Sequence, residues 1–111
     1  MRDDRRPYAH EIPEQFKGYR CSDYFASERF RSGVWSESEQ LWLIISADEV
    51  VERPERGFLV VGRPGVDGIE FGYRRGHNGI WAYYPIDDDF RYVAPTVSTL
   101  VEGWLGGSIT V

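Results

Sequence analysis

The sequence predicts an α+β domain in which a mostly antiparallel sheet is packed by a few helices. Three observations support this class. Short apolar or aromatic runs typical of strands follow one another between residues 41 and 93. Only a few turn-forming residues separate each run from the next. One amphipathic helical pattern follows near the C-terminus. Strands grouped with short connections favour antiparallel pairing, and a helix after such a group belongs to the α+β class.

The composition indicates one domain over residues 1–111. Hydrophobic residues make up 41% of the chain, and four Trp, seven Tyr and six Phe are enough to fill a core. No apolar run approaches the roughly 20 residues of a membrane-spanning helix, and Cys21 has no second cysteine to pair with. We therefore expect a cytoplasmic domain without a membrane partner. Residues 1–10, MRDDRRPYAH, are expected to form a flexible arm.

The charge is negative and unevenly distributed. The net charge is −5, and residues 32–111 alone contain six basic and twelve acidic side chains. A protein that binds the phosphate backbone of nucleic acid needs a cationic surface, so this balance argues against a nucleic-acid partner. It favours a basic partner instead.

The first half of the chain gives local signals for a short helix, a strand and a second helix. Pro13 near the start of residues 12–16 is compatible with a first helical turn. Residues 41–45, LWLII, are apolar and typical of a buried strand. Ser46 with Glu49 three residues later matches a capping box, which predicts a helix through about residue 52 that ends before Pro54.

The second half predicts further strands and the clearest helix. Residues 58–62, FLVVG, form an apolar run, and residues 69–86 flank an Asn-Gly turn as a hairpin. The acidic triplet 87–89 is expected to turn the chain before a short strand over 90–93. Thr96 is the expected N-cap of a helix that Gly106 and Gly107 end, with an apolar face formed by Val97, Leu100, Val101, Trp104 and Leu105.

Two registers of the hairpin remain open, and they differ in which residues share a face. With a two-residue turn at Asn78 and Gly79, Arg74 pairs with Tyr83. One face then holds Ile69, Phe71, Tyr73, Ala82, Tyr84 and Ile86, and the other holds Glu70, Gly72, Arg74, Trp81, Tyr83 and Pro85. With a five-residue loop over 75–79, Phe71, Tyr73, Trp81 and Tyr83 form the core row instead.

The order of these segments resembles a known superfamily. The segments are LWLIISADEVVE, then FLVVGRPG, then IEFGYRRGHNGIWAYYPIDDD, and finally APTVSTLVEGW. Together they make residues 41–105 similar to the SUKH superfamily, the Smi/Knr-like domains. The resemblance implies an α+β domain that, in bacteria, most often acts as an immunity protein against a delivered toxin, or, as in fungi, as a regulatory interaction module. It implies no catalytic residue.

Residues that could perform chemistry are few and scattered. His10, His77 and Cys21 are the whole supply of soft metal ligands, and the triplet 87–89 lacks the spacing of a calcium loop. The glycines of residues 62–68 lack the Lys-Ser/Thr ending of a phosphate loop, and neither histidine stands in a pattern that suggests a nucleophilic triad. We therefore expect no enzymatic activity, no metal and no cofactor.

The leading hypothesis is a protein-binding domain, an immunity protein that covers a basic toxin. Aromatic and charged residues near the hairpin would form the contact, because aromatic and arginine side chains are enriched in interface hot spots. The candidate residues are Glu70, Arg74, Trp81, Tyr83, Asp87, Asp88 and Asp89. Two alternatives stay open: a small-ligand or enzymatic domain with the aromatic hairpin as a pocket wall, and a regulatory or scaffold domain. The sequence leaves open the identity of the partner, the oligomeric state and the structure of residues 1–34.

Overall fold

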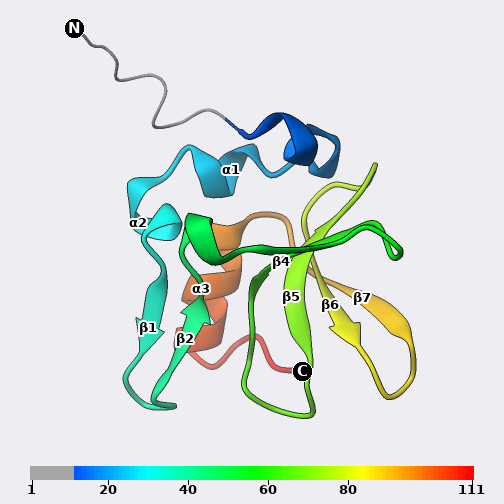
Figure 1. The fold of residues 1–111 in the computed structure, drawn as a ribbon. Coiled ribbons are helices and arrows are strands. Elements are labelled where there is room, and N and C mark those ends of the chain that lie inside the picture. The colour runs from blue at the N-terminus through cyan, green and yellow to red at the C-terminus, as the bar shows by residue number, and fades with distance from the viewer. Residues whose placement is uncertain (1–11) are drawn as a thin grey trace, which may run out of the picture.

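A computed structural model describes residues 12–111 of the chain, so the expected arm over residues 1–10 and His10 lie outside the described part. Seven strands form one sheet in which every pairing is antiparallel, which confirms the α+β class (Figure 1). The elements in chain order are η2 (Glu14–Tyr19, a 3-10 helix), α1 (Ser22–Phe25), α2 (Glu28–Arg31), β1 (Val34–Ser36), β2 (Leu41–Ile44), η3 (Ala47–Glu49, a 3-10 helix), β3 (Val51–Arg53), β4 (Phe58–Gly62), β5 (Glu70–Arg74), β6 (Ile80–Tyr84), β7 (Asp89–Ala94) and α3 (Val97–Leu105). No helix among these residues has the length and hydrophobicity to cross a membrane.

Strand β4 is the centre of the sheet because three strands pair with it. The order is β1-β2-β4-β5-β6-β7, and β3 pairs with the first half of β4 through Val51 opposite Val60. β2 pairs with its last residue, Gly62, through Ile44. The backbones of β2 and β4 approach each other so closely at Gly62 that an added Cβ would lie 2.3 Å from the backbone oxygen of Leu43, so this position requires glycine. Within residues 12–111, β1, β3 and β7 each pair with a single neighbour and so present an open edge.

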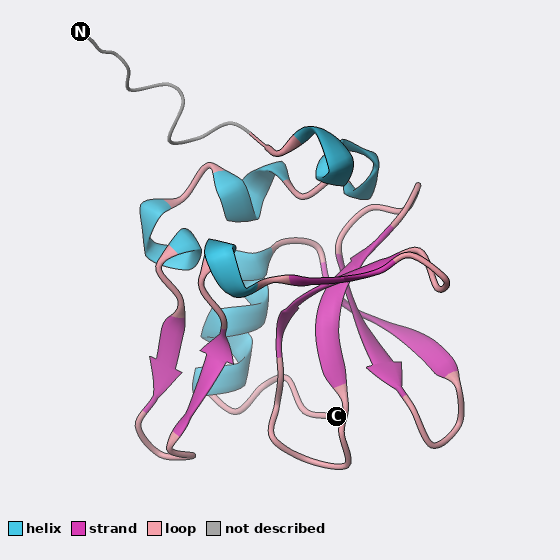
Figure 2. Ribbon diagram, in the orientation of Figure 1, coloured by secondary structure: helices cyan, strands magenta, loops and turns pink. Residues whose placement is uncertain are grey.

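The main core lies between the sheet, α3 and the N-terminal helices. Figure 2 shows the short N-terminal helices gathered along the upper end of the sheet, with α3 running alongside the strands. The ring of Phe71 on β5 meets Trp104 of α3 at a centroid distance of 5.8 Å. Residues 12–33 contribute several buried aromatic side chains to this core, namely Phe16, Tyr19, Tyr24, Phe25 and Phe30. Residues 12–33, which show no clear sequence pattern, are therefore part of the core.

The helix predicted from the capping box at Ser46 is wrong. Only the single 3-10 turn η3 forms, and the chain continues as β3 from Val51. The Ser46 hydroxyl donates to the Asp48 carboxylate at 2.7 Å and accepts no amide hydrogen bond from the first turn. Pairing of β3 with β4 satisfies the backbone hydrogen-bonding groups of this segment and places Val51 against Phe58 and Val60. These tertiary contacts override the weak local preference for a helix.

The predicted C-terminal helix is confirmed. α3 covers Val97 to Leu105, and the hydroxyl of Thr96 accepts the backbone amide of Thr99 at 3.1 Å. The predicted strands over 41–45, 58–62 and 90–93 are also present, as β2, β4 and β7. The buried face of α3 is narrower than predicted, because Leu105 is exposed.

Neither predicted register of the hairpin is correct. Tyr83 pairs with Glu70, four residues before Arg74, and Trp81 pairs with Gly72. The backbone amides of Arg75 and Gly76 donate to the carbonyls of Gly57 and Gly18, at 2.8 and 3.0 Å, so other segments hold the loop open. The shift of four residues is even, so the face assignment of the two-residue alternative still holds.

Candidate functional site

Five side chains from β5, β6 and β7 form the face of the sheet that points away from α3. We call this surface the β5–β7 outer face, and it consists of Arg74, Trp81, Tyr83, Phe90 and Tyr92. The pairings of Tyr83 with Phe90 and of Trp81 with Tyr92 place these rings side by side. Ring centroids of these two pairs lie 5.0 and 5.5 Å apart. The structure therefore brings together three of the predicted site residues, Arg74, Trp81 and Tyr83, on one face.

Arg74 is the centre of this face. Its guanidinium carbon lies 4.7 Å from the ring centroid of Trp81 and 4.4 Å from that of Phe90. Within residues 12–111 no carboxylate forms an ion pair with it. A guanidinium held between two rings is fixed in orientation while its N–H donors stay free of a charged partner, which suits recognition of a partner's acceptor groups.

Tyr83 lies beneath the surface, with an exposed fraction of 4%. Phe58 and Phe90 pack against its ring, and the guanidinium of Arg56 lies 4.5 Å from its centroid. Its hydroxyl donates to Asp88 at 2.5 Å, and this hydrogen bond raises the pKa of Tyr83. Tyr83 thus supports the outer face from below.

The acidic residues predicted to contact a basic partner are already paired within the chain. Glu70 has an exposed fraction of 9% and binds Arg53 at 2.6 Å, a contact that raises the pKa of the arginine. Asp87 and Asp89 both face Arg91, at 3.6 and 3.3 Å. Together with the Tyr83–Asp88 hydrogen bond, these contacts leave the β5–β7 outer face without an unpaired carboxylate from the predicted set.

A surface depression lies beside Tyr83, but it is not the aromatic pocket that the alternative hypothesis requires. It has a volume of about 310 Å³ and is lined by Arg53, Glu55, Arg56, Gly68, Glu70, Tyr83 and Pro85. Trp81 and Arg74 do not contribute to its wall. Charged side chains that already pair with one another dominate it, so it offers little apolar surface to a small ligand.

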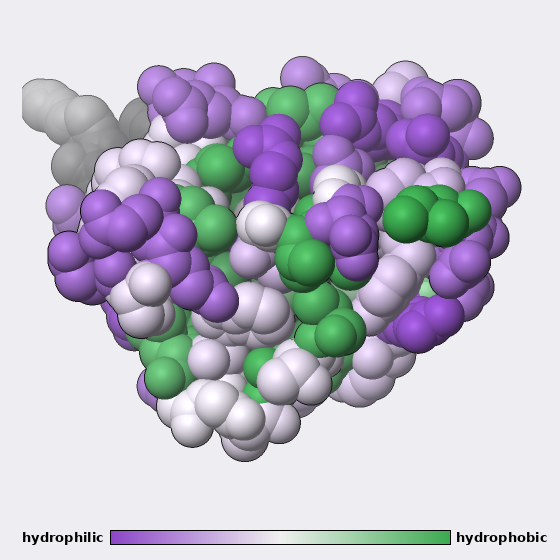
Figure 3. Space-filling view, turned by 90° about the horizontal axis from the view of Figure 1, so that it is seen from below, coloured by the Kyte–Doolittle hydropathy of each residue, from purple (hydrophilic) through white to green (hydrophobic). Residues whose placement is uncertain are grey.

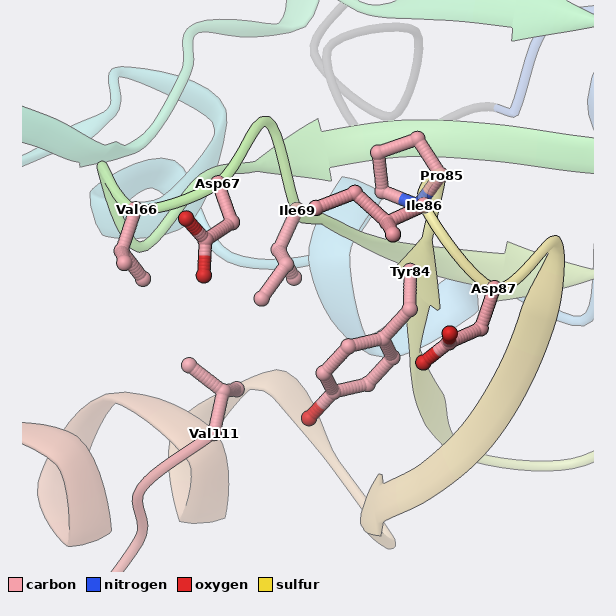
Figure 4. Close-up of a pocket in the computed structure, with 8 residues that line it drawn as sticks. All are labelled: Val66, Asp67, Ile69, Tyr84, Pro85, Ile86, Asp87 and Val111. Carbon is pink, nitrogen blue, oxygen red and sulfur yellow. The ribbon is translucent and has the colours of Figure 1, made fainter.

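A second depression lies at the end of β6, where Figure 4 shows Val111 facing Tyr84 and Ile69 across the opening. Its volume is about 190 Å³, and its lining residues are Val66, Asp67, Ile69, Tyr84, Pro85, Ile86, Asp87 and Val111. Figure 3, seen from below, shows hydrophobic residues reaching the surface among polar ones on this side. Its wall combines aliphatic side chains with Tyr84 and two carboxylates, Asp67 and Asp87.

The structure reveals one exposed aromatic pair that the sequence analysis missed. Trp35 on β1 and Trp42 on β2 pair directly, and their ring centroids lie 5.3 Å apart. Trp42 stands inside the run LWLII, which was interpreted as a buried strand, and β1 was not predicted. Two tryptophans on either side of a polar turn, Trp-Ser-Glu-Ser-Glu-Gln-Leu-Trp, were the available signal.

Cys21 and His77, the potentially reactive groups within residues 12–111, lie in different surroundings. Burial raises the pKa of the Cys21 thiol to about 12, so it stays protonated at neutral pH and is a poor nucleophile. His77 is exposed and packs edge-on against Trp81 at 5.5 Å. No group of three or more His, Cys, Asp or Glu residues within 12–111 is placed to hold a metal ion.

Comparison of the chain with protein-family models, with curated proteins and with solved structures gave no match.

Proposed function

We propose that this chain is a non-catalytic protein-binding domain of the SUKH-like immunity type, which neutralises a toxin by covering part of its surface. The β5–β7 outer face carries the proposal. Its half-buried Trp81 contacts both exposed Tyr92 and an arginine already held in place, and among residues 12–111 no helix covers them. Trp, Tyr and Arg are the residues that most often dominate binding energy at protein interfaces.

Two further observations support the same function. The rings and Arg74 are fixed by contacts within the sheet, so binding would cost little side-chain entropy. The net charge of −5 supports a partner of positive charge, because complementary charge speeds association and disfavours wrong partners. The strands and the final helix over residues 41–105 support the comparison with SUKH domains, whose bacterial members act in this way, while strand β3 replaces the helix expected after Ser46.

Co-expression tests the proposal directly. A toxin encoded beside this gene is expressed with and without the full chain, and growth and complex formation are measured. We expect protection from the toxin and a complex that survives size-exclusion chromatography. If neither protection nor a complex is found with any neighbouring toxin, the proposed function is rejected.

Point variants then test the surface. Trp81→Ala should weaken the complex about 30-fold, the effect of losing a hot-spot tryptophan worth about 2 kcal/mol. Leu105→Ala is the matched control, because Leu105 is an exposed apolar residue at the end of α3. Equal affinities of the two variants would exclude the β5–β7 outer face as the contact and leave the function itself to the co-expression result.

A further inference from the structure

Trp35 and Trp42 contact each other, but much of each indole ring remains exposed to solvent. Their exposed fractions are 42% and 53%, and both lie on the same side of the β1–β2 pair. The two rings meet edge to face, at 71°. Single exposed apolar residues are common on protein surfaces, but two adjacent tryptophans form a contiguous patch of the kind found at interfaces.

These tryptophans border an open strand edge. Within residues 12–111, β1 pairs only with β2, and Figure 1 shows no segment along its other side. The outer edge of β1 therefore offers backbone donors and acceptors to an added strand. Trp35 is the middle residue of β1, so a segment paired there would lie beside the exposed rings.

The segment that forms β1 and β2 carries charge of one sign, while Arg29 and Arg31 of α2 precede it in the chain. Residues 33–50 contain four carboxylates, Glu37, Glu39, Asp48 and Glu49, and no basic residue. None of the four forms an ion pair in the part of the chain that the structure describes. Glu49 shares with Trp42 a depression of about 140 Å³, and Glu37 follows Trp35 by two residues at the start of the β1–β2 turn. These carboxylates contrast with those near the β5–β7 outer face, which are neutralised internally.

We infer that this Trp35–Trp42 surface, with the edge of β1, Glu37 and Glu49, binds a basic, extended segment of the partner protein. The segment adds a strand to β1, an arginine or lysine packs on the tryptophan rings, and the carboxylates pair with neighbouring positive charges. A second copy of this chain is a poor occupant, because the same four carboxylates would face one another. The inference rests on the proposed function only in that the segment belongs to a protein partner, and it names a contact separate from the β5–β7 outer face.

Nuclear magnetic resonance with a defined peptide tests the inference without the partner. The full chain, labelled with ¹⁵N, is titrated with a ten-residue peptide of alternating arginine and valine. We expect saturable shifts of the indole signals of Trp35 and Trp42 and of the β1 amides, while the Trp81 indole stays in place. A peptide of alternating glutamate and valine should cause none of these shifts.

Charge-neutralising variants supply the quantitative arm. The double variant Glu37→Gln, Glu49→Gln should bind the basic peptide about tenfold more weakly, as expected for the loss of two surface charge contacts worth about 1.4 kcal/mol together. The control Glu55→Gln, Glu102→Gln removes two exposed carboxylates elsewhere and should bind as the unaltered protein does.

Three outcomes of the peptide titration would overturn the inference. The first is shifts centred on Trp81, the second is no saturable shift, and the third is a concentration-dependent shift of Trp35 without peptide, which would indicate self-association. If Trp35→Ala and Trp42→Ala leave a captured partner bound as tightly as before, this contact is excluded while the proposed function stands.

Discussion

At the scale of single residues, Asp23 shows how much of this fold depends on one side chain. One oxygen of its carboxylate accepts the hydroxyl of Tyr73 on β5 at 2.8 Å, and the other accepts the backbone amide of Val97 at 2.7 Å. Val97 is the first residue of α3, where negative charge is favourable to the helix. Nothing local in the sequence distinguishes Asp23 from the other acidic residues, since both partners are distant in the chain.

Removal of the Tyr73 hydroxyl should therefore lower the free energy of unfolding more than a change of one oxygen atom usually does. Tyr73→Phe should lower the free energy of unfolding by about 1–2 kcal/mol, because a buried hydrogen bond to a charged group is lost without a gain in volume. Urea denaturation at pH 7 measures the effect. Tyr92→Phe is the control, since the Tyr92 side chain is exposed, and its effect should stay below about 0.5 kcal/mol. Similar losses in both variants would contradict the role given to Asp23.

At the scale of elements, two similar sequence signals had different outcomes. Thr96 and Ser46 were both expected to cap helices, but only Thr96 accepts a backbone amide. After Thr96 the apolar residues recur at helical spacing and pack on the core. After Ser46 the β-branched pair Val50 and Val51 enters an extended segment beside β4. In this chain, a cap residue starts a helix only where the residues after it can pack on the core in helical conformation.

The two positions offer a matched comparison. Thr96→Ala should lower the free energy of unfolding by about 1 kcal/mol, the usual cost of losing an N-cap. Ser46→Ala should cost less than about 0.5 kcal/mol, because the hydroxyl contacts only the exposed Asp48 side chain. Chemical denaturation of both variants in one buffer is the measurement. The assignment of Thr96 as the only cap of the two fails if Ser46→Ala proves equally destabilising.

The elements that the sequence predicted well are those whose signal is local. β2, β4 and α3 each carry an apolar run or helical spacing of their own. The N-terminal helices α1 and α2 have four residues each, too few to show a helical period. The hairpin register was missed because carbonyls of Gly18 and Gly57 bind the loop amides, which a local turn rule cannot anticipate.

The same division holds for the candidate site. The two-residue turn predicted that Arg74, Trp81 and Tyr83 share a face, whereas the five-residue alternative put Arg74 on the opposite face, and the pairing of Trp81 with Gly72 decides for the former. The internal pairing of Glu70 with Arg53 depends on β3, a strand that the sequence analysis replaced with a helix. The exposure of Trp42 depends on the unpredicted β1 and on the position of the pair at the sheet edge.

For the molecule taken together, Cys21, Tyr24 and Tyr73 are ionisable groups buried in the main core. Cys21, Tyr24 and Tyr73 are all inaccessible or nearly so. Burial is the main cause that raises the pKa of each, to about 12 for Cys21, because the charged form would lose its hydration. In the unfolded chain, the thiol and the tyrosine hydroxyls titrate near their ordinary values of about 8.5 and 10.

Stability should therefore fall at alkaline pH. Below about pH 8 all three groups are protonated in both states, and their contribution is complete. Above about pH 9 the unfolded chain releases protons that the folded protein retains, so the free energy of unfolding decreases by up to about 1.4 kcal/mol per pH unit for each group. Urea midpoints between pH 7 and 11 measure this fall, and Tyr73→Phe should make it shallower. A constant midpoint over this range would contradict the burial of these groups.

The position of Asp23 also constrains how the chain reaches its folded state during synthesis. Its two partners lie 50 and 74 residues further along the chain. The segment that contains α1 is synthesised before both partners, so these two hydrogen bonds can form only after β5 and the start of α3 have been made. The buried aromatic side chains of residues 16–30 share their core with Val97, Leu100 and Val101, so their packing is complete only once α3 has been synthesised.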